Sequence, residues 1–139
     1  MVAFNKFEDT VEQMLTAVHN FTAAGHVVRV YLSNATPSAS LDAGLADLAD
    51  ISGGNGYTAG GEDSQNTMTE SGGTATVATT DVVWTSSGAG FGPFRYVAHY
   101  NDTAASNNLV CWHDYASAIT PANGETFTIN YGASLFTLA

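Results

Sequence analysis

Basic residues are nearly absent from this sequence. Only Lys6, Arg29 and Arg95 carry positive charge, against 13 acidic residues, and the formal net charge is −10. Proteins bind nucleic acids largely by neutralising phosphates with lysine and arginine, and acidic membrane surfaces attract basic segments. We therefore expect neither nucleic acid nor membrane as a partner, whereas a basic protein surface is compatible with this charge.

Cysteine and long apolar runs are also scarce. Cys111 is the only cysteine, so the chain has no intrachain disulfide and no zinc-finger spacing. No apolar run approaches the roughly 18 residues that cross a bilayer. The first ten residues lack the basic-then-apolar profile of a signal peptide, so we expect synthesis in a cytoplasm.

Small neutral residues take the place of charge. Charged residues make up 12% of the chain, about half of the roughly 25% typical of soluble domains. Hydrophobic residues make up 45%, which is enough to build a core and argues against general disorder. The length predicts a single domain over residues 1–139.

An apolar stripe near the N-terminus predicts one helix, over about residues 5–19. The stripe follows helical spacing and consists of Phe7, Val11, Met14, Leu15 and Val18. Asn5 and Glu8 have the spacing of a capping box, which predicts a helix start near Asn5. We expect this helix to cover its own sheet, and the alternative is a helix that docks on a partner.

Short alternating segments fill the remainder, and we expect the sheet to extend over about residues 26–138. Residues 94–100 and 109–115 are predicted to pair, with Phe94, Tyr96, Ala98 and Tyr100 on one face. A Gly72-Gly73 dipeptide predicts a hairpin. Residues 38–51 fit either a short helix or a loop. About seven to nine short strands indicate a mainly β fold, an antiparallel β-sandwich of jelly-roll type with one N-terminal helix.

One cluster of reactive residues follows from the predicted pairing. His99 would lie close to Cys111 or His113, since opposed side chains in a sheet are about 5 Å apart. A Cys-His nucleophile pair or a metal site are the functional alternatives, but a small thiol between apolar neighbours is usually a core residue. We therefore predict no enzyme activity, no catalytic residue, no metal site and no cofactor. The scattered acids give no calcium-binding loop pattern.

Several sequence blocks resemble one family of small proteins encoded in tailed-bacteriophage genomes. The blocks are MVAFNKFEDTVEQMLTAVHN, VYLSNATPSAS, GNGYTAGG, GPFRYVAHYND, GETFTINY and the terminal LFTLA, and together they span residues 1–139. Proteins of this kind resemble capsid decoration, or cement, proteins with jelly-roll-type folds. The resemblance implies no catalytic residues.

The resemblance implies a decoration protein that binds and stabilises the shell of the major capsid protein. It would be made in the cytoplasm of a bacterial host and located in the virion, on the capsid exterior. We also expect a homo-oligomer, a dimer or trimer at a capsid symmetry axis. The alternative is a tail or head-fibre module that recognises host glycans through Trp84, Trp112 or tyrosines. A third hypothesis, a small hydrolase using Cys111, lacks an orienting constellation.

Six residues are predicted to contact a partner or another protomer. They are Arg95, Asn55, Tyr57, Asn101, Asp102 and Phe136. Arg95 is a rare cation in an apolar strand and is expected to pair with Asp114 or Asp81. The glycine-rich loop around Asn55 is expected to reach across a neighbouring surface. The last strand, with Phe136, is expected to pair with a sheet edge of another chain.

Overall fold

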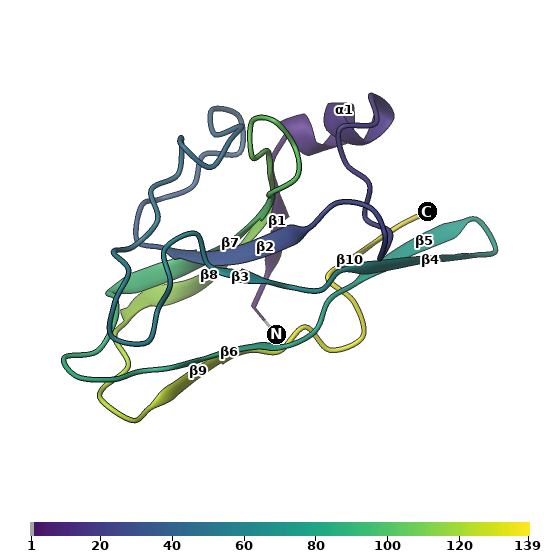
Figure 1. The fold of residues 1–139 in the computed structure, drawn as a ribbon. Helices are drawn as coiled ribbons and strands as arrows, with labels where there is room; N and C mark the ends of the chain where they lie inside the picture. The colour runs from purple at the N-terminus through teal and green to yellow at the C-terminus, as the bar shows by residue number, and fades with distance from the viewer. Residues whose placement is uncertain (1) are drawn as a thin grey trace.

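The computed structural model describes residues 2–139. Within this range the chain forms ten strands and one short helix, α1 (Asp9–Leu15), and all strand pairs are antiparallel (Figure 1). The strands are β1 (Phe4–Lys6), β2 (Val28–Ser33), β3 (Glu62–Asp63), β4 (Thr67–Ser71), β5 (Thr74–Ala78), β6 (Val82–Thr85), β7 (Phe94–Asn101), β8 (Leu109–Ile119), β9 (Thr126–Ile129) and β10 (Phe136–Leu138). The predicted mainly β, antiparallel fold with one N-terminal helix is therefore confirmed.

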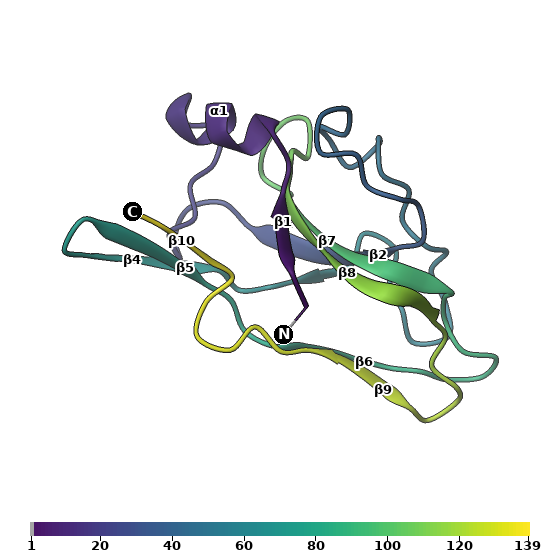
Figure 2. The same ribbon diagram turned by 180° about the vertical axis from the view of Figure 1, so that it is seen from behind.

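The strands form three sheets. One has five strands in the order β1-β8-β7-β2-β3, one has three strands in the order β10-β5-β4, and β6 pairs with β9 alone. In Figure 1 the β6–β9 ribbon runs below the five-stranded sheet, and the β4–β5 hairpin extends to one side. Seen from behind in Figure 2, β1 and β10 lie on either side of the region below α1. The arrangement is sandwich-like, with two facing layers and one open end.

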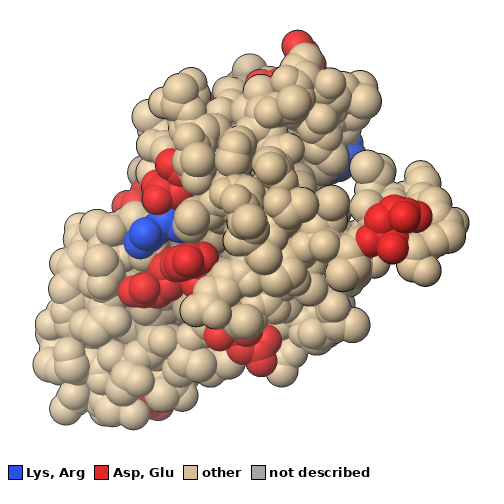
Figure 3. All heavy atoms as spheres, turned by 45° about the vertical axis from the view of Figure 1, so that its right-hand side comes forward, with Lys and Arg blue, Asp and Glu red and all other residues tan. Residues whose placement is uncertain are grey.

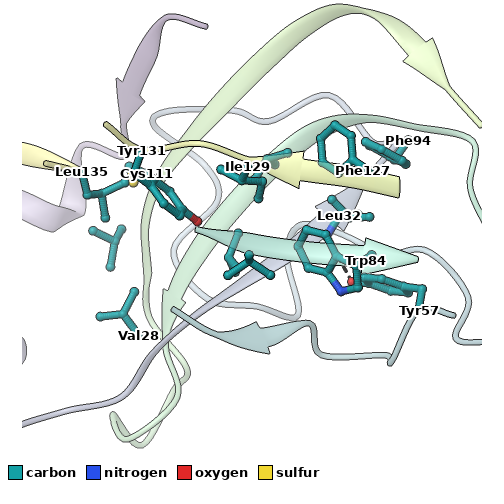
Figure 4. Close-up of a cluster of buried hydrophobic side chains, with 14 of the residues drawn as sticks. Val28, Leu32, Tyr57, Trp84, Phe94, Cys111, Phe127, Ile129, Tyr131 and Leu135 are labelled. Atoms are coloured by element: carbon teal, nitrogen blue, oxygen red, sulfur yellow. Dashed lines mark hydrogen bonds between the residues drawn. The ribbon is translucent and has the colours of Figure 1, made fainter. Parts of the chain in front are cut away.

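The main core fills the space between the two layers. Side chains of β2, β7 and β8 meet side chains of β6 and β9 there. Figure 4 shows Tyr131 and Cys111 at one end of this core and Trp84 and Tyr57 at the other. Burial of a large apolar side chain stabilises a fold by roughly 1.5–3 kcal/mol, so the contact between the layers is the main source of stability.

A second, smaller core covers the opposite face of the five-stranded sheet. Tyr31 and Tyr100 pack edge to face with ring centroids 5.6 Å apart, and Leu48 is buried in the same cluster. The Tyr31 hydroxyl donates a hydrogen bond to the carbonyl oxygen of Leu48 (3.0 Å). Residues 38–51 contain no helix, so of the two alternatives for this segment the wrapped loop is observed.

β7 is the middle strand of the five-stranded sheet, and it pairs with β8, as the alternating pattern predicts. His99 lies opposite Cys111, and Val97 opposite His113. A register shift between Phe94 and Tyr96 changes the face of the sheet on which the Phe94 side chain lies. Phe94 therefore packs in the main core with Val97, and its predicted place on the face of Ala98 and Tyr100 is wrong. Between the pairs Phe94–Ile119 and Tyr96–Asp114 the chain advances two residues in β7 and five in β8, and such an irregularity breaks the period of two.

The predicted helix over residues 5–19 is too long at both ends. Asn5 belongs to β1 and lies opposite Trp112 of β8, so it does not cap the helix. Glu8 occupies the N-cap position without a side-chain capping bond. At the other end Ala17 has φ 60°, which ends the helix. Sheet hydrogen bonds made with a distant strand outweigh the local capping signal.

Candidate functional site

An apolar groove lies where α1, β1 and β10 meet, and we call it the α1–β10 groove. Its volume is about 320 Å³. The apolar side chains that line it include Phe4, Val11, Met14, Leu15, Phe136 and Leu138. The groove is the open end of the sandwich-like core. The five-stranded sheet ends there with its edge strand β1, and the three-stranded sheet ends there with its edge strand β10. The rings of Phe4 in β1 and Phe136 in β10 meet with centroids 5.8 Å apart.

The groove exposes large aliphatic side chains to solvent. Leu15 is 85% exposed, Leu138 57% and Val11 47%. On α1 the buried residues are the polar Thr10 and Gln13 rather than the apolar stripe. The Thr10 hydroxyl donates to the carbonyl oxygen of Val110 (2.8 Å), which turns Val11 outward. The expectation that the stripe covers its own sheet therefore fails for Val11 and Leu15.

A second hollow continues from the groove past Met14, Phe136 and Leu138. Its volume is about 460 Å³, and it reaches Phe21 and Met68. The exposed apolar surface therefore extends from α1 across β10 to the base of the β4–β5 hairpin. Contiguous apolar patches on soluble proteins mark interaction sites more often than isolated apolar residues do.

Phe136 is the predicted contact residue that lies in the groove. It is half-buried in β10, which pairs with β5 of the same protomer, and its ring packs edge to face on Phe21 (5.4 Å). Because β10 has a neighbour on one side only in the described part of the chain, its outer edge borders the groove. The strand is thus paired within the protomer, and the predicted pairing with another chain remains a prediction for its outer edge.

Arg95 lies outside the groove, in an ion pair. Its Nε and Nη2 donate to the two carboxylate oxygens of Asp114 at 2.7 and 2.8 Å, which confirms the first of the two expected partners. The guanidinium lowers the pKa of the Asp114 carboxyl through these hydrogen bonds. Both side chains are partly exposed, and exposed pairs contribute little to stability.

The glycine-rich loop lies against its own protomer. Tyr57 is buried, and its hydroxyl accepts a hydrogen bond from the Leu32 amide (3.1 Å). Asn55 is exposed, but its side-chain amide donates to the Gly90 carbonyl (2.8 Å). Tyr57 is therefore a core residue rather than a contact residue, whereas most of the loop is exposed and the contact predicted for Asn55 stays a prediction.

Asn101 and Asp102 end β7 and have different environments. Asn101 is fully buried, so it is not a surface contact. Its side-chain amide donates toward His19 Nδ1 (3.0 Å) and His26 Nδ1 (2.9 Å), which holds the segment after α1 against the sheet. Asp102 is exposed, and its carboxylate lies 4.0 Å from Arg29.

The predicted reactive cluster forms, with Cys111 and His99 fully buried and His113 half-buried. The rings of His99 and His113 lie edge to face with centroids 5.5 Å apart, and His99 Nε2 is 2.8 Å from the Tyr131 hydroxyl. Burial raises the pKa of the Cys111 thiol and holds the pKa of His99 well below its usual value. Among residues 2–139 no three His, Cys, Asp or Glu side chains are grouped to hold a metal ion.

The tryptophans do not form a sugar-binding platform. Trp84 is buried and stacks near Phe127 with centroids 6.1 Å apart. Trp112 packs against the ring of Phe7 (4.6 Å) in the second core. Stacking on a sugar requires an open aromatic face, and the surroundings of these two rings do not favour one.

Charge is distributed unevenly over the surface. The face in Figure 3 is mostly neutral, with separate groups of acidic atoms and few basic ones. Near the groove, Glu8, Asp9 and Glu12 are exposed on or beside α1, against one exposed cation, Lys6. Of the residues that line the groove only Lys6 is charged, and the three acids lie on or next to the helix that forms one of its walls. Within the described residues no helix is long and apolar enough to cross a membrane.

Val11, Leu15 and Leu138 are not among the six contact residues predicted from the sequence, although the alternative of a docking helix included Val11 and Leu15. The signal was present, because the N-terminal stripe and the apolar C-terminal segment were both visible. Their meeting depends on the pairing of β1 with β8 and of β10 with β5, which joins the two ends of the chain.

Comparisons of the chain with protein-family models, with curated protein sequences and with solved structures give no match.

Proposed function

We propose that this protein is a bacteriophage capsid decoration protein, which binds and stabilises the shell formed by the major capsid protein. The observation that carries the proposal is the α1–β10 groove, because it combines exposed Leu15, Leu138 and Val11 on a molecule whose single thiol is buried. A surface of this kind is suited to a stable protein contact. The resemblance of the GPFRY, GETFT and GNGYTAGG blocks to phage proteins supplies the shell as the partner.

The charge of the molecule supports the same proposal. A net charge of −10 on an outer layer keeps particles apart by like-charge repulsion. We also propose a dimer or trimer on the capsid exterior, at a symmetry axis of the shell. The fibre-module alternative receives no support from the positions of Trp84 and Trp112.

An inventory of purified phage particles tests the proposal. Quantitative mass spectrometry should find this chain in a fixed, high ratio to the major capsid protein, of the order of one copy per few shell subunits. A few copies per particle would instead indicate a tail or fibre component. Absence of the chain from purified particles would end the proposal.

A further inference from the structure

The α1–β10 groove has an unused strand edge beside its apolar floor. β1 pairs only with β8 in the described chain. The Phe7 amide donates to the Val110 carbonyl across this pair (3.3 Å). In an antiparallel pair the inward hydrogen bonds alternate along the strand, so Asn5 also bonds to β8. The backbone amides and carbonyls of Phe4 and Lys6 consequently point away from β8.

Two side chains of this edge, Phe4 and Lys6, line the groove. Phe4 does so together with the apolar Leu15 and Leu138. An extended segment laid along β1 would satisfy the free amides and carbonyls and place alternate side chains into the hollow. A volume of about 320 Å³ is at the small end of ligand sites and fits a few large aliphatic side chains.

Charge decides between the candidate occupants. Lys6 is the one charged residue in the lining of the groove, but Glu8, Asp9 and Glu12 are exposed on or next to α1, and the molecule as a whole has a net charge of −10. A second copy of this chain would bring another net charge of −10, and like charges at close range disfavour association. A segment with lysine or arginine next to its aliphatic residues is complementary to this net charge.

We propose that the α1–β10 groove binds one extended segment of a partner protein by strand addition to β1, and that this segment carries large aliphatic side chains flanked by basic residues. The identity of the partner as the shell protein rests on the proposed function. The chemistry of the segment rests on the groove and on the net charge of the protein.

A synthetic peptide tests the chemistry directly. The probe has about nine residues, the length of an ordinary strand, with leucine alternating with threonine and a lysine at each end. A matched peptide carries glutamate in place of both lysines. With the purified protein, we expect the lysine peptide to bind at least about tenfold more tightly, and its affinity to fall as salt screens the charges.

Two matched variants locate the binding site. Leu15→Ser removes a groove side chain that is 85% exposed, and Val83→Ser removes a side chain of β6 that is 54% exposed. Both are expected to fold, because the altered side chains face solvent. Leu15→Ser should weaken peptide binding about tenfold, whereas Val83→Ser should leave it unchanged.

Hydrogen exchange tests the strand addition. Peptide binding should slow exchange at the Phe4 and Lys6 amides, which have no partner across β8, and should leave Asn5 nearly unchanged as an internal control. Equal affinity for both peptides, no binding, or binding that ignores Leu15→Ser would overturn the proposal. A groove-dependent dimer without peptide binding would identify a second copy as the occupant and also overturn it. Peptide binding as expected, together with absence of the chain from particles, would leave the groove assignment standing and refute the capsid function.

Discussion

At the scale of single residues, burial determines which groups can react. Cys111 is fully buried in the main core between the two layers, and burial raises the pKa of its thiol. The thiolate is the reactive form of cysteine. A protonated thiol without solvent contact is therefore a packing residue.

Cys111 should resist thiol reagents in the folded protein. We expect labelling by a small alkylating reagent at neutral pH to be at least about a hundredfold slower in the folded protein than in denaturant, because the thiol reacts only after the core opens. Mass spectrometry of timed samples gives both rates. Rapid labelling of the folded protein, at the rate of a free thiol, would contradict the buried position.

Two glycines with positive φ differ in the space available for a side chain. Gly61 has φ +69°, and a Cβ at this position would collide with the carbonyl oxygen of Val30, whereas Gly73 has φ +85° with nothing within 4 Å of such a Cβ. Gly73→Ala should cost about 1 kcal/mol from the left-handed backbone alone. Gly61→Ala should cost more than about 4 kcal/mol or prevent folding. Urea denaturation measures both, and similar losses would contradict the close approach of the loop to β2.

At the scale of elements, a buried polar network fastens the segment after α1 to β7. Asn101 Oδ1 accepts hydrogen bonds from the amides of Thr103 and Ala104, both at 3.1 Å. This fixes the orientation of the amide, so its nitrogen donates toward His19 and His26. The connection therefore depends on imidazole nitrogens that are free of protons.

This network predicts a pH dependence of stability. Burial, and then the nearby His26, lower the pKa of His19 from 6.5 to about 4. Between these values the unfolded chain binds the proton and the folded chain does not, so stability is full above about pH 6.5 and falls as the pH drops toward 4. The expected loss from His19 is at most about 3 kcal/mol.

Comparison of wild type with His19→Gln isolates this contribution, because His99 and His113 also have lowered pKa values and act in the same direction. Urea unfolding at pH values from 7 to 4 should give a shallower curve for the variant. Parallel curves for the two proteins would show that His19 is not held neutral by the fold.

The elements that sequence patterns predicted are those with a local signal. Alternation predicted the β7–β8 pair, and Gly72-Gly73 predicted the β4–β5 hairpin, both observed. Two features had no local signal: the register shift after Phe94, and the pairing of Phe4–Lys6 with β8 as strand β1 where the sequence predicted the start of a helix. Each depends on a partner strand far away in the chain, and local propensity is overridden by such pairing.

At the scale of the whole molecule, a sandwich-like core is left open at one end. Two edge strands and α1 surround this end, and the exposed Leu15 and Leu138 belong to it. Elsewhere the molecule buries its thiol and two of its four imidazole groups, those of His19 and His99. Our proposal is therefore of an acidic scaffold that associates with a partner through the α1–β10 groove.

Co-sedimentation with capsid shells tests this account most directly. Shells assembled without this chain are mixed with the wild-type protein, with Leu15→Ser and with Val83→Ser, and the bound fraction is measured across a range of concentrations. Wild type and Val83→Ser should saturate the shells at the same fixed ratio, and Leu15→Ser should need at least about tenfold more protein. Equal binding by all three proteins, or binding by none, would contradict docking through the α1–β10 groove.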